Sequence, residues 1–461
     1  MLQFYSEHSR SGNTIRVKSF FFQENEDITS FFYRERVFLG NISLNDLQRS
    51  QNNNRIGFMQ CHLKGNEYVK IYTIPKTVQL SPEVTEQDAL GHFNQYFAEY
   101  LRLRSIYSQR GFKVIADNII DVERVRVDSV ENYLVKRYER ALNEVLSFFK
   151  RHSRERLLSN EFKSQSITNG INLKRNITEL NKSNVHQVEE IKYNYSRFAE
   201  IAFATIECFR RERLLLFTNS LPLEVAVQRL SVYLRKYLSG KFLLNTTTSG
   251  GTRVFERLQS RLFDKTPETK RLRENLMILI GAESQGQYHK VTNIDSVWFS
   301  PEYMYELMVC DHFEQIADKI GISISPKPTM NYNLLVDSKP VLTNQSIPDL
   351  ILNVMHHNVT VIIDSKWKRI SDWSDIQLDD ILKIYRDKCV FKRNGCPGPV
   401  IVLTYPSIAI PKDEYLGRIL SHTYNDEVAF LIMEVAPFNL HNTGLFARQL
   451  LLSLGRYNMD S

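Results

Sequence analysis

Two segments in the last third of the chain decide its predicted fold: IPDLIL (347–352) and VIIDSKWK (361–368). Each is an apolar run rich in β-branched residues, which is typical of a buried strand. Charged residues interrupt both runs, with Asp349 in the first and Asp364 and Lys366 in the second. Burying an unpaired carboxylate is costly, so a buried carboxylate is usually paired or holds a metal. These acids therefore mark a candidate functional site.

The spacing Pro-Asp, then a strand ending Asp-x-Lys, is the PD-(D/E)xK arrangement of metal-dependent nucleases. If the two strands form a hairpin, Asp349 and Asp364 meet at one end and can hold Mg²⁺ at a phosphodiester. Strand alternation points Lys366 to the same face as Asp364, where it can orient water and stabilise the developing charge. The carbonyl of Ser365 could add a metal ligand, and Glu306 on a preceding helix could complete the acidic cluster.

Each of these residues also has a structural explanation. Asp364 and Lys366 could form a surface ion pair at a strand end, contributing under about 1 kcal/mol. Asp349 could cap a turn, and Glu306 could face water. His356 and His357 read as turn residues and are not expected to bind metal.

The overall composition narrows the possible classes of protein but does not identify the function. The chain has 461 residues, 43% of them hydrophobic, which predicts several domains. A net charge of +7 is compatible with a polyanionic partner such as DNA but does not demand one. The five cysteines form no paired metal spacing, and no signal peptide or membrane-length apolar run is present. We therefore expect a cytoplasmic protein with no membrane contact. No phosphate-binding loop is found, so any nucleotide hydrolysis must come from another chain.

Periodicity predicts a mixed α/β fold. We expect residues 1–125 to form a β-rich N-terminal domain with a hairpin over 56–63 and 68–76, and residues 126–295 a mainly helical middle region. Residues 296–461 are predicted to form an α/β domain around a mixed sheet, and the PD-(D/E)xK spacing favours the restriction-endonuclease type for it. Helical stripes begin near His92, at Asp128 with a capping box to Glu131, and at Tyr195. The C-terminal pattern predicts helices over 301–320, 374–391 and 444–454, and strands over 332–336, 347–354, 359–364, 399–406 and 428–435.

Several motifs resemble the McrC family, the nuclease subunits of McrBC-type, modification-dependent restriction systems. DSKWK (364–368) resembles the family's Asp-x-Lys-Trp-Lys signature, and YMYELMV (303–309) its Tyr-Glu helix. IYRD (384–387) resembles the helix after the active strand, which supplies Tyr385. The hairpin ending in Pro75-Lys76 and the segment GINLKRNI (170–177) resemble an N-terminal strand pair and a mid-chain strand of the family. One departure is that Ile381 stands where related nucleases often carry Gln.

The resemblance implies a DNA endonuclease subunit of a bacterial or archaeal phage-defence system. Its expected catalytic residues are Asp349, Asp364, Lys366, Glu306 and Tyr385. The first two acids, Glu306 and the Ser365 carbonyl would hold Mg²⁺, which Mn²⁺ could replace. The expected partner is a McrB-like AAA+ GTPase hexamer, on which the N-terminal half docks and whose hydrolysis it stimulates. Two other readings stay open: a non-catalytic DNA-binding adaptor that activates the motor, and a stand-alone nuclease of the resolvase type.

Overall fold

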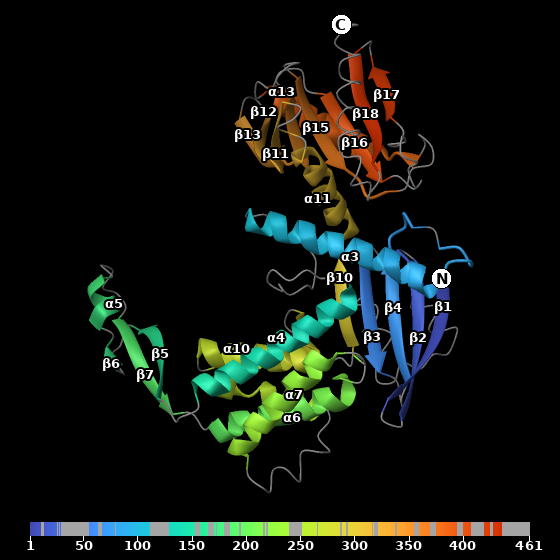
Figure 1. Cartoon of the computed structure of the whole chain (residues 1–461). Helices are drawn as coiled ribbons and strands as arrows, with labels where there is room; N and C mark the ends of the chain where they lie inside the picture. The colour runs from blue at the N-terminus through green and yellow to red at the C-terminus, as the bar shows by residue number, and fades with distance from the viewer. Residues whose placement is uncertain are drawn as a thin grey trace.

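The computed structural model contains an N-terminal sheet, a helical middle region and a C-terminal sheet, which confirms the predicted mixed α/β layout (Figure 1). The structure describes residues 1–10, 13–24, 26, 28, 55–62, 67–78, 80–110, 129–152, 157–164, 170–171, 173–178, 185–192, 195–214, 217, 220–238, 251–264, 266–285, 288–291, 294–315, 317, 321–336, 339–354, 359–368, 375–393, 400–406, 419–424 and 427–435.

Among the described residues, five strands form the N-terminal sheet, in the order β1-β2-β4-β3-β10. Their bounds are β1 Leu2–Arg10, β2 Asn13–Gln23, β3 Ile56–His62, β4 Glu67–Ile74 and β10 Ile294–Phe299. β3 and β4 pair antiparallel, so the predicted hairpin is confirmed. β2 runs parallel to β4, and β10 closes the other edge by pairing with β3. Gly57 lies opposite Trp298 there, and a Cβ on Gly57 would come within 1.9 Å of the indole.

The helices of the N-terminal and middle regions are α3 Glu86–Gln109, α4 Val130–Arg151, α6 Tyr195–Glu212, α7 Leu221–Leu234, α9 Gly251–Leu258 and α10 Pro267–Leu279, with short 3-10 turns η2 Arg235–Tyr237 and η4 Arg261–Phe263. α3 begins before the expected His92, because Thr85 and Asp88 form a capping box. The predicted capping box of α4 is wrong. Its N-cap is Ser129, whose hydroxyl accepts from the backbone N–H of Asn132, three residues on. No helix in the described ranges is long and apolar enough to cross a membrane.

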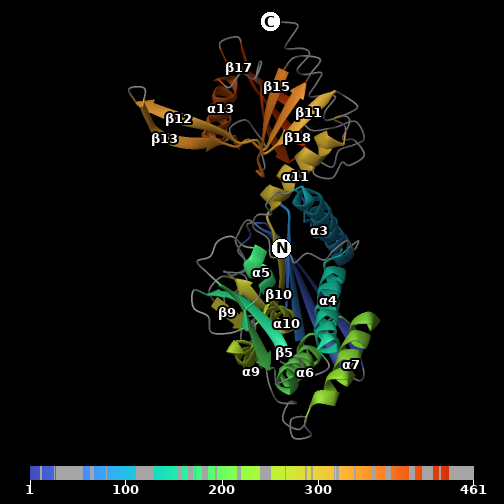
Figure 2. The same cartoon turned by 90° about the vertical axis from the view of Figure 1, so that its left-hand side faces the viewer.

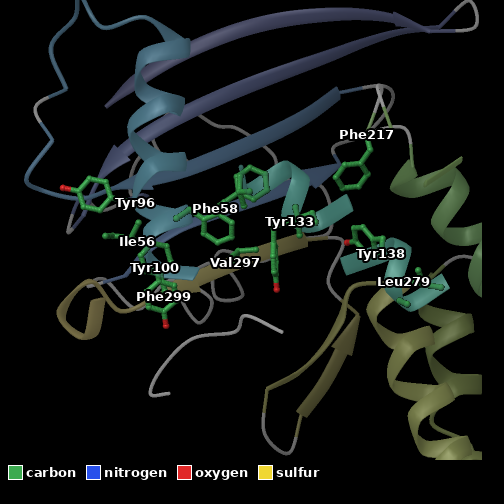
Figure 3. Close-up of a cluster of buried hydrophobic side chains, with 14 of the residues drawn as sticks. Ile56, Phe58, Tyr96, Tyr100, Tyr133, Tyr138, Phe217, Leu279, Val297 and Phe299 are labelled. Atoms are coloured by element: carbon green, nitrogen blue, oxygen red, sulfur yellow. The ribbon is translucent and has the colours of Figure 1, made fainter. Parts of the chain in front are cut away.

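Aromatic side chains join the N-terminal sheet to these helices (Figure 3). Tyr100 of α3 stacks on Phe299 of β10, with ring centroids 4.4 Å apart. Phe97 meets Tyr133 of α4 edge to face at 5.5 Å. All four rings are buried. The aromatic side chains of α3 and α4 are therefore part of the hydrophobic core and pack these helices against the sheet.

Two smaller sheets accompany the middle region. β5 Leu157–Ser164, β6 Gly170–Ile171 and β7 Val185–Lys192 pair in the order β5-β7-β6, next to α5 Leu173–Thr178; β8 Ala282–Gln285 pairs with β9 Tyr288–Val291. The expected strand over residues 170–177 is wrong, because only two residues pair with β7 and a helix follows at once. In Figure 1 the β5–β7 sheet lies away from α6, α7 and α10.

In the part of the C-terminal domain that the structure describes, six strands form one sheet, in the order β11-β14-β15-β16-β18-β17. The elements here are α11 Pro301–Glu314, β11 Ile322–Pro326, β12 Met330–Val336, β13 Lys339–Ser346, β14 Leu350–Val354, β15 Val359–Ser365, α13 Leu378–Arg393, β16 Val400–Pro406, β17 Ile419–Tyr424 and β18 Glu427–Val435. β14 and β15 pair antiparallel, which confirms the predicted hairpin. β15 then runs parallel to β16, and β16 parallel to β18, so the sheet is mixed.

Several C-terminal details differ from the sequence prediction. α11 ends at Glu314 instead of Ile320, and α13 begins at Leu378 instead of Ser374. β11, β13 and β17 were not predicted. β12 and β13 form a separate two-stranded ribbon that projects from the sheet in Figure 2. The helix expected over 444–454 lies outside the described residues.

The connection between the N-terminal sheet and the C-terminal domain is short. β10 spans the predicted boundary between residues 295 and 296, and by its pairing it belongs to the N-terminal sheet. Ser300 follows directly and caps α11, its hydroxyl accepting from the N–H of Tyr303. α11 then packs both on α3 and on β15.

Candidate nuclease site

The two predicted acids meet at one end of the β14–β15 hairpin. Asp349 directly precedes β14, where Leu350 is paired with Ile363 of β15. Its carboxylate accepts a hydrogen bond from the backbone N–H of Ser365 at 2.6 Å, across the end of the hairpin. Asp364 is the next residue back along β15, so the hairpin register brings both acids to the same edge of the sheet. The predicted meeting of Asp349 and Asp364 is thus present in the structure.

Asp364 is fully buried and lies between two lysines. The ammonium of Lys366 is 2.5 Å from Oδ2, and that of Lys383 on α13 is 2.6 Å from Oδ1. The alternative of a surface ion pair does not hold, because the side chain of Asp364 has no solvent exposure and that of Lys366 is 15% exposed. Leaving a buried carboxylate without a cation is far more costly than losing an exposed pair. The lysines therefore neutralise a charge that the fold forces into the protein.

Carboxylates crowd around Asp349. Burial and the nearby charges of Glu306 and Asp364 raise its pKa to about 8. Like charges that repel in this way are typical of a functional site that needs a bound cation. The role of a simple turn cap does not explain such a buried acid beside two others.

Glu306 lies on α11 and is held by Lys327, whose ammonium donates to Oε2 at 2.6 Å. Its side chain is 22% exposed, so it does not simply face water. Lys327 has a φ of 44°, the left-handed region that non-glycine residues seldom adopt. Its backbone N–H donates to the carbonyl of Asp349 at 2.9 Å, which ties this strained residue to the site. Backbone strain of this kind persists where the surroundings fix it, often at functional positions.

A second layer of charges comes from the start of α13. Asp380 is buried and lies 3.9 Å from the ammonium of Lys366 and 2.7 Å from that of Lys368. Lys368 also donates to the side-chain oxygen of Gln377 at 2.6 Å. The lysines of the Asp-x-Lys-x-Lys segment are therefore oriented by α13.

Tyr385 is on the same helix, two residues after Lys383. Its ring packs, together with Ile381, against an apolar cluster between α13 and the sheet that includes Ile362 and Tyr405. A catalytic role for Tyr385 stays a prediction. Ile381, at the position where the resemblance expects Gln, is here a packing residue.

The residues fit a two-carboxylate metal site better than a larger one. Within the part of the chain that the structure describes, no group of three His, Cys, Asp or Glu side chains is placed to hold a metal ion. Asp349 and Asp364 lie together at one end of the β14–β15 hairpin, whereas Glu306 comes from α11 and pairs with Lys327. Metal binding by Glu306 stays a prediction. Burial, and after it the negative charges of Glu306 and Asp364, raise the pKa of Asp349, and a divalent cation would neutralise that charge. Oxygen ligands of this kind suit Mg²⁺ or Mn²⁺.

Sequence reasoning missed three residues of the site: Lys327, Asp380 and Lys383. The signal for Asp380 and Lys383 is their spacing of three, which puts both on one face of α13. A helix face with mixed charge normally faces solvent, so this pattern offered no reason to choose it. Lys327 could be noticed only as a lysine between two prolines, at a turn before the ribbon.

Comparison with known proteins gives a remote likeness. No protein-family model and no curated protein matches the chain. A chain from the refined half-complex of a tetradecameric assembly of Thermococcus gammatolerans McrB AAA+ hexamers with bound McrC is similar, with a TM-score of 0.44 and 13% identity over 95% of this chain and 100% of that chain. A chain of the cryo-EM structure of the Thermococcus gammatolerans McrBC complex gives a TM-score of 0.27 and 11% identity, covering 65% of this chain and 87% of that one. At such scores, the case for a function rests on the contacts of the site itself.

Proposed function

We propose that this chain is a Mg²⁺-dependent DNA endonuclease, the cutting subunit of a McrBC-like restriction system. The observation that carries the proposal is the hydrogen bond from the Ser365 N–H to Asp349. It places two acids at the strand end from which Lys366 projects onto Asp364. The resemblance of DSKWK (364–368) to the McrC signature supports the same assignment.

The chemistry follows from the positions of these side chains. Asp349 and Asp364, with the carbonyl of Ser365, would hold the metal. A bound Mg²⁺ supplies an activated water and stabilises charge on the leaving oxygen. Lys366 would orient the attacking water and donate to a phosphate oxygen, since its ammonium is already held at the edge of the acid pair. Glu306, which Lys327 holds in place, would add negative charge near the cation without binding it directly.

The partner in this proposal is an AAA+ GTPase ring of the McrB type. The chain contains no phosphate-binding loop, so a motor function must reside elsewhere. The N-terminal half would dock on the ring and stimulate its hydrolysis, while the ring would deliver DNA to the site.

The test is cleavage of linear and supercoiled DNA by the full chain, in Mg²⁺ and in Mn²⁺, with and without an AAA+ GTPase of the McrB type. Asp364→Ala and Lys366→Ala should abolish cleavage, and Lys388→Ala, elsewhere on α13, should not. Full cleavage by the Lys366→Ala protein would refute the assignment of the site.

One observation favours a second candidate, a non-catalytic adaptor. Both carboxylate oxygens of Asp364 are occupied by lysines, which is also how a site that binds DNA without cutting could be stabilised. An adaptor would stimulate GTP hydrolysis by the partner but would cut no DNA in either metal. The same assay therefore separates the two functions.

A further inference from the structure

The N-terminal sheet reaches the candidate site through two residues at one of its ends. Glu24 follows the last residue of β2, and Lys76 lies just beyond β4, after Pro75. The backbone N–H of Glu24 donates to the carbonyl of Ile74 at 2.9 Å, which holds the two parallel strand ends together. Both side chains therefore leave the sheet at the same place.

These two side chains hold Trp367, the residue after the candidate catalytic lysine. The indole N–H of Trp367 donates to both carboxylate oxygens of Glu24, at 2.9 and 2.7 Å. The ammonium of Lys76 donates to the backbone carbonyl of Trp367 at 2.5 Å and lies 5.5 Å from the centre of its ring. Tyr305 of α11 packs on the indole from the C-terminal domain, with centroids 5.6 Å apart. Glu24 therefore fixes the indole N–H of Trp367, Lys76 fixes its backbone carbonyl, and Tyr305 packs against its ring.

The contact is polar and buried, which makes it directional. The side chain of Glu24 is only 2% exposed and lies 3.8 Å from the ammonium of Lys76. Burial raises the pKa of Glu24 and lowers that of Lys76, and each charge partly offsets the effect on the other. An apolar contact would join the two domains at a lower desolvation cost, but it would let one domain shift relative to the other. A buried network of hydrogen bonds fixes one geometry.

Lys366 lies between this contact and the sheet. Its backbone N–H donates to the carbonyl of Thr404 in β16 at 2.8 Å, one residue beyond the end of β15. The next residue is Trp367, held by Glu24 and Lys76. The backbone at Lys366 is therefore fixed on one side by the C-terminal sheet and on the other by the N-terminal sheet.

We propose that Glu24 and Lys76 are positioning residues for Lys366, so that the N-terminal sheet sets the geometry of the nuclease site through Trp367. This inference rests on the proposed function and adds a route by which a partner docked on the N-terminal half can regulate cutting. A shift at the ends of β2 and β4 moves the carbonyl and the indole of Trp367, and with them the adjacent ammonium.

The test compares Glu24→Gln and Lys76→Met with a matched control, Lys18→Met. Glu24→Gln keeps an acceptor for the indole, and Lys76→Met keeps the length of the side chain but removes its charge. Lys18 forms an ion pair with Glu67 on the same sheet, 3.7 Å apart and partly exposed. Each full-length protein is assayed, with the AAA+ partner, for the single-turnover rate on a duplex and for the DNA concentration that gives half of that rate. Mn²⁺ binding is measured by calorimetry, and the fold is checked by thermal denaturation.

The expected result is a fall of about tenfold to a hundredfold in the maximal rate for Lys76→Met, as for a catalytic group displaced by about 1 Å. The maximal rate of the Glu24→Gln protein should also fall. The half-saturating DNA concentration and Mn²⁺ affinity should stay at wild-type values, because the variants leave Asp349, Asp364 and the other side chains of the site unchanged. Lys76→Arg, which keeps the charge and a donor, should recover most of the rate, and Lys18→Met should match wild type.

Three outcomes decide the matter. If wild type cuts, Asp364→Ala does not, and the folded Glu24 and Lys76 variants match Lys18→Met, the positioning role is refuted while the nuclease stands. A loss of rate that comes only with weaker DNA binding also refutes it. If wild type cuts nothing in either metal, the proposed function fails and this inference falls with it. Should Lys76→Met fail to fold, Glu24→Gln and Lys76→Arg decide the question.

Discussion

Replacing Asp349 with Asn should stabilise the metal-free protein, increasingly so as pH rises. The pKa of Asp349 is raised from 3.8 to about 8, first by burial and then by the charges of Glu306 and Asp364. A carboxyl whose pKa is higher in the folded state destabilises the fold once pH exceeds its unfolded value. The destabilisation grows until pH passes the folded pKa and is constant above it. The amide introduced by Asp349→Asn carries no charge, and its oxygen can still accept from the Ser365 N–H.

The magnitude follows from the size of the shift. Each unit between the two pKa values corresponds to about 1.4 kcal/mol of destabilisation. The largest expected destabilisation is about 4 kcal/mol at pH 7 and about 2 kcal/mol at pH 5. The stability difference between Asp349→Asn and wild type should therefore rise by about 1 kcal/mol per pH unit through this range. Saturating Mg²⁺ should shrink the difference, because binding the acid pair stabilises only wild type.

The assay is urea unfolding in EDTA at pH 5, 6, 7 and 8, followed by circular dichroism. Asp379→Asn is the control, since this exposed acid at the start of α13 should change stability by under about 1 kcal/mol. The reasoning is refuted if Asp349→Asn is no more stable than wild type at pH 8. It is also refuted if the gain is the same at every pH.

Three further changes test the fold and the site. Gly57→Ala should destabilise the protein by about 1–3 kcal/mol, because its Cβ would lie 1.9 Å from the buried indole of Trp298; a wild-type urea midpoint would contradict this. Thr85→Ala should cost about 1 kcal/mol through loss of the capping box of α3, read from the same unfolding curves. Lys383→Met should lower the Mg²⁺ concentration for half-maximal cleavage by about three- to fivefold, since a partly exposed ammonium competing for Asp364 contributes up to about 1 kcal/mol. An unchanged or raised Mg²⁺ requirement would exclude that competition.

Local patterns in the sequence were enough to predict the hairpin that carries the acids. Two apolar runs with a short polar interval predict β14 and β15, and alternation then places Asp364 and Lys366 together. The buried strand β16 was equally clear from its composition. These predictions succeed because each depends on residues that are neighbours in the chain, and because a carboxylate in an apolar run is unusual enough to notice.

Predictions that depend on distant pairing could not be made. Nothing in the sequence of β10 indicates that it pairs with β3, because strand pairing depends on a register that only the folded chain defines. The two cations on Asp364 show the same limit. Lys366 is close in sequence and was found, whereas Lys383 comes from a helix that reads as solvent-exposed. The contact of Glu24 with Trp367 spans still more of the chain and has no local signature.

The pairing of β10 with β3 has a consequence for how the protein is made. During synthesis the edge of β3 stays unpaired until β10, which ends at Phe299, has emerged from the ribosome. This is because β10 follows the helical middle region in the sequence. An unpaired strand edge on a nascent chain invites association with other chains. An expression fragment meant to carry the N-terminal half should thus extend through Phe299, and a fragment that stops before Ile294 should aggregate.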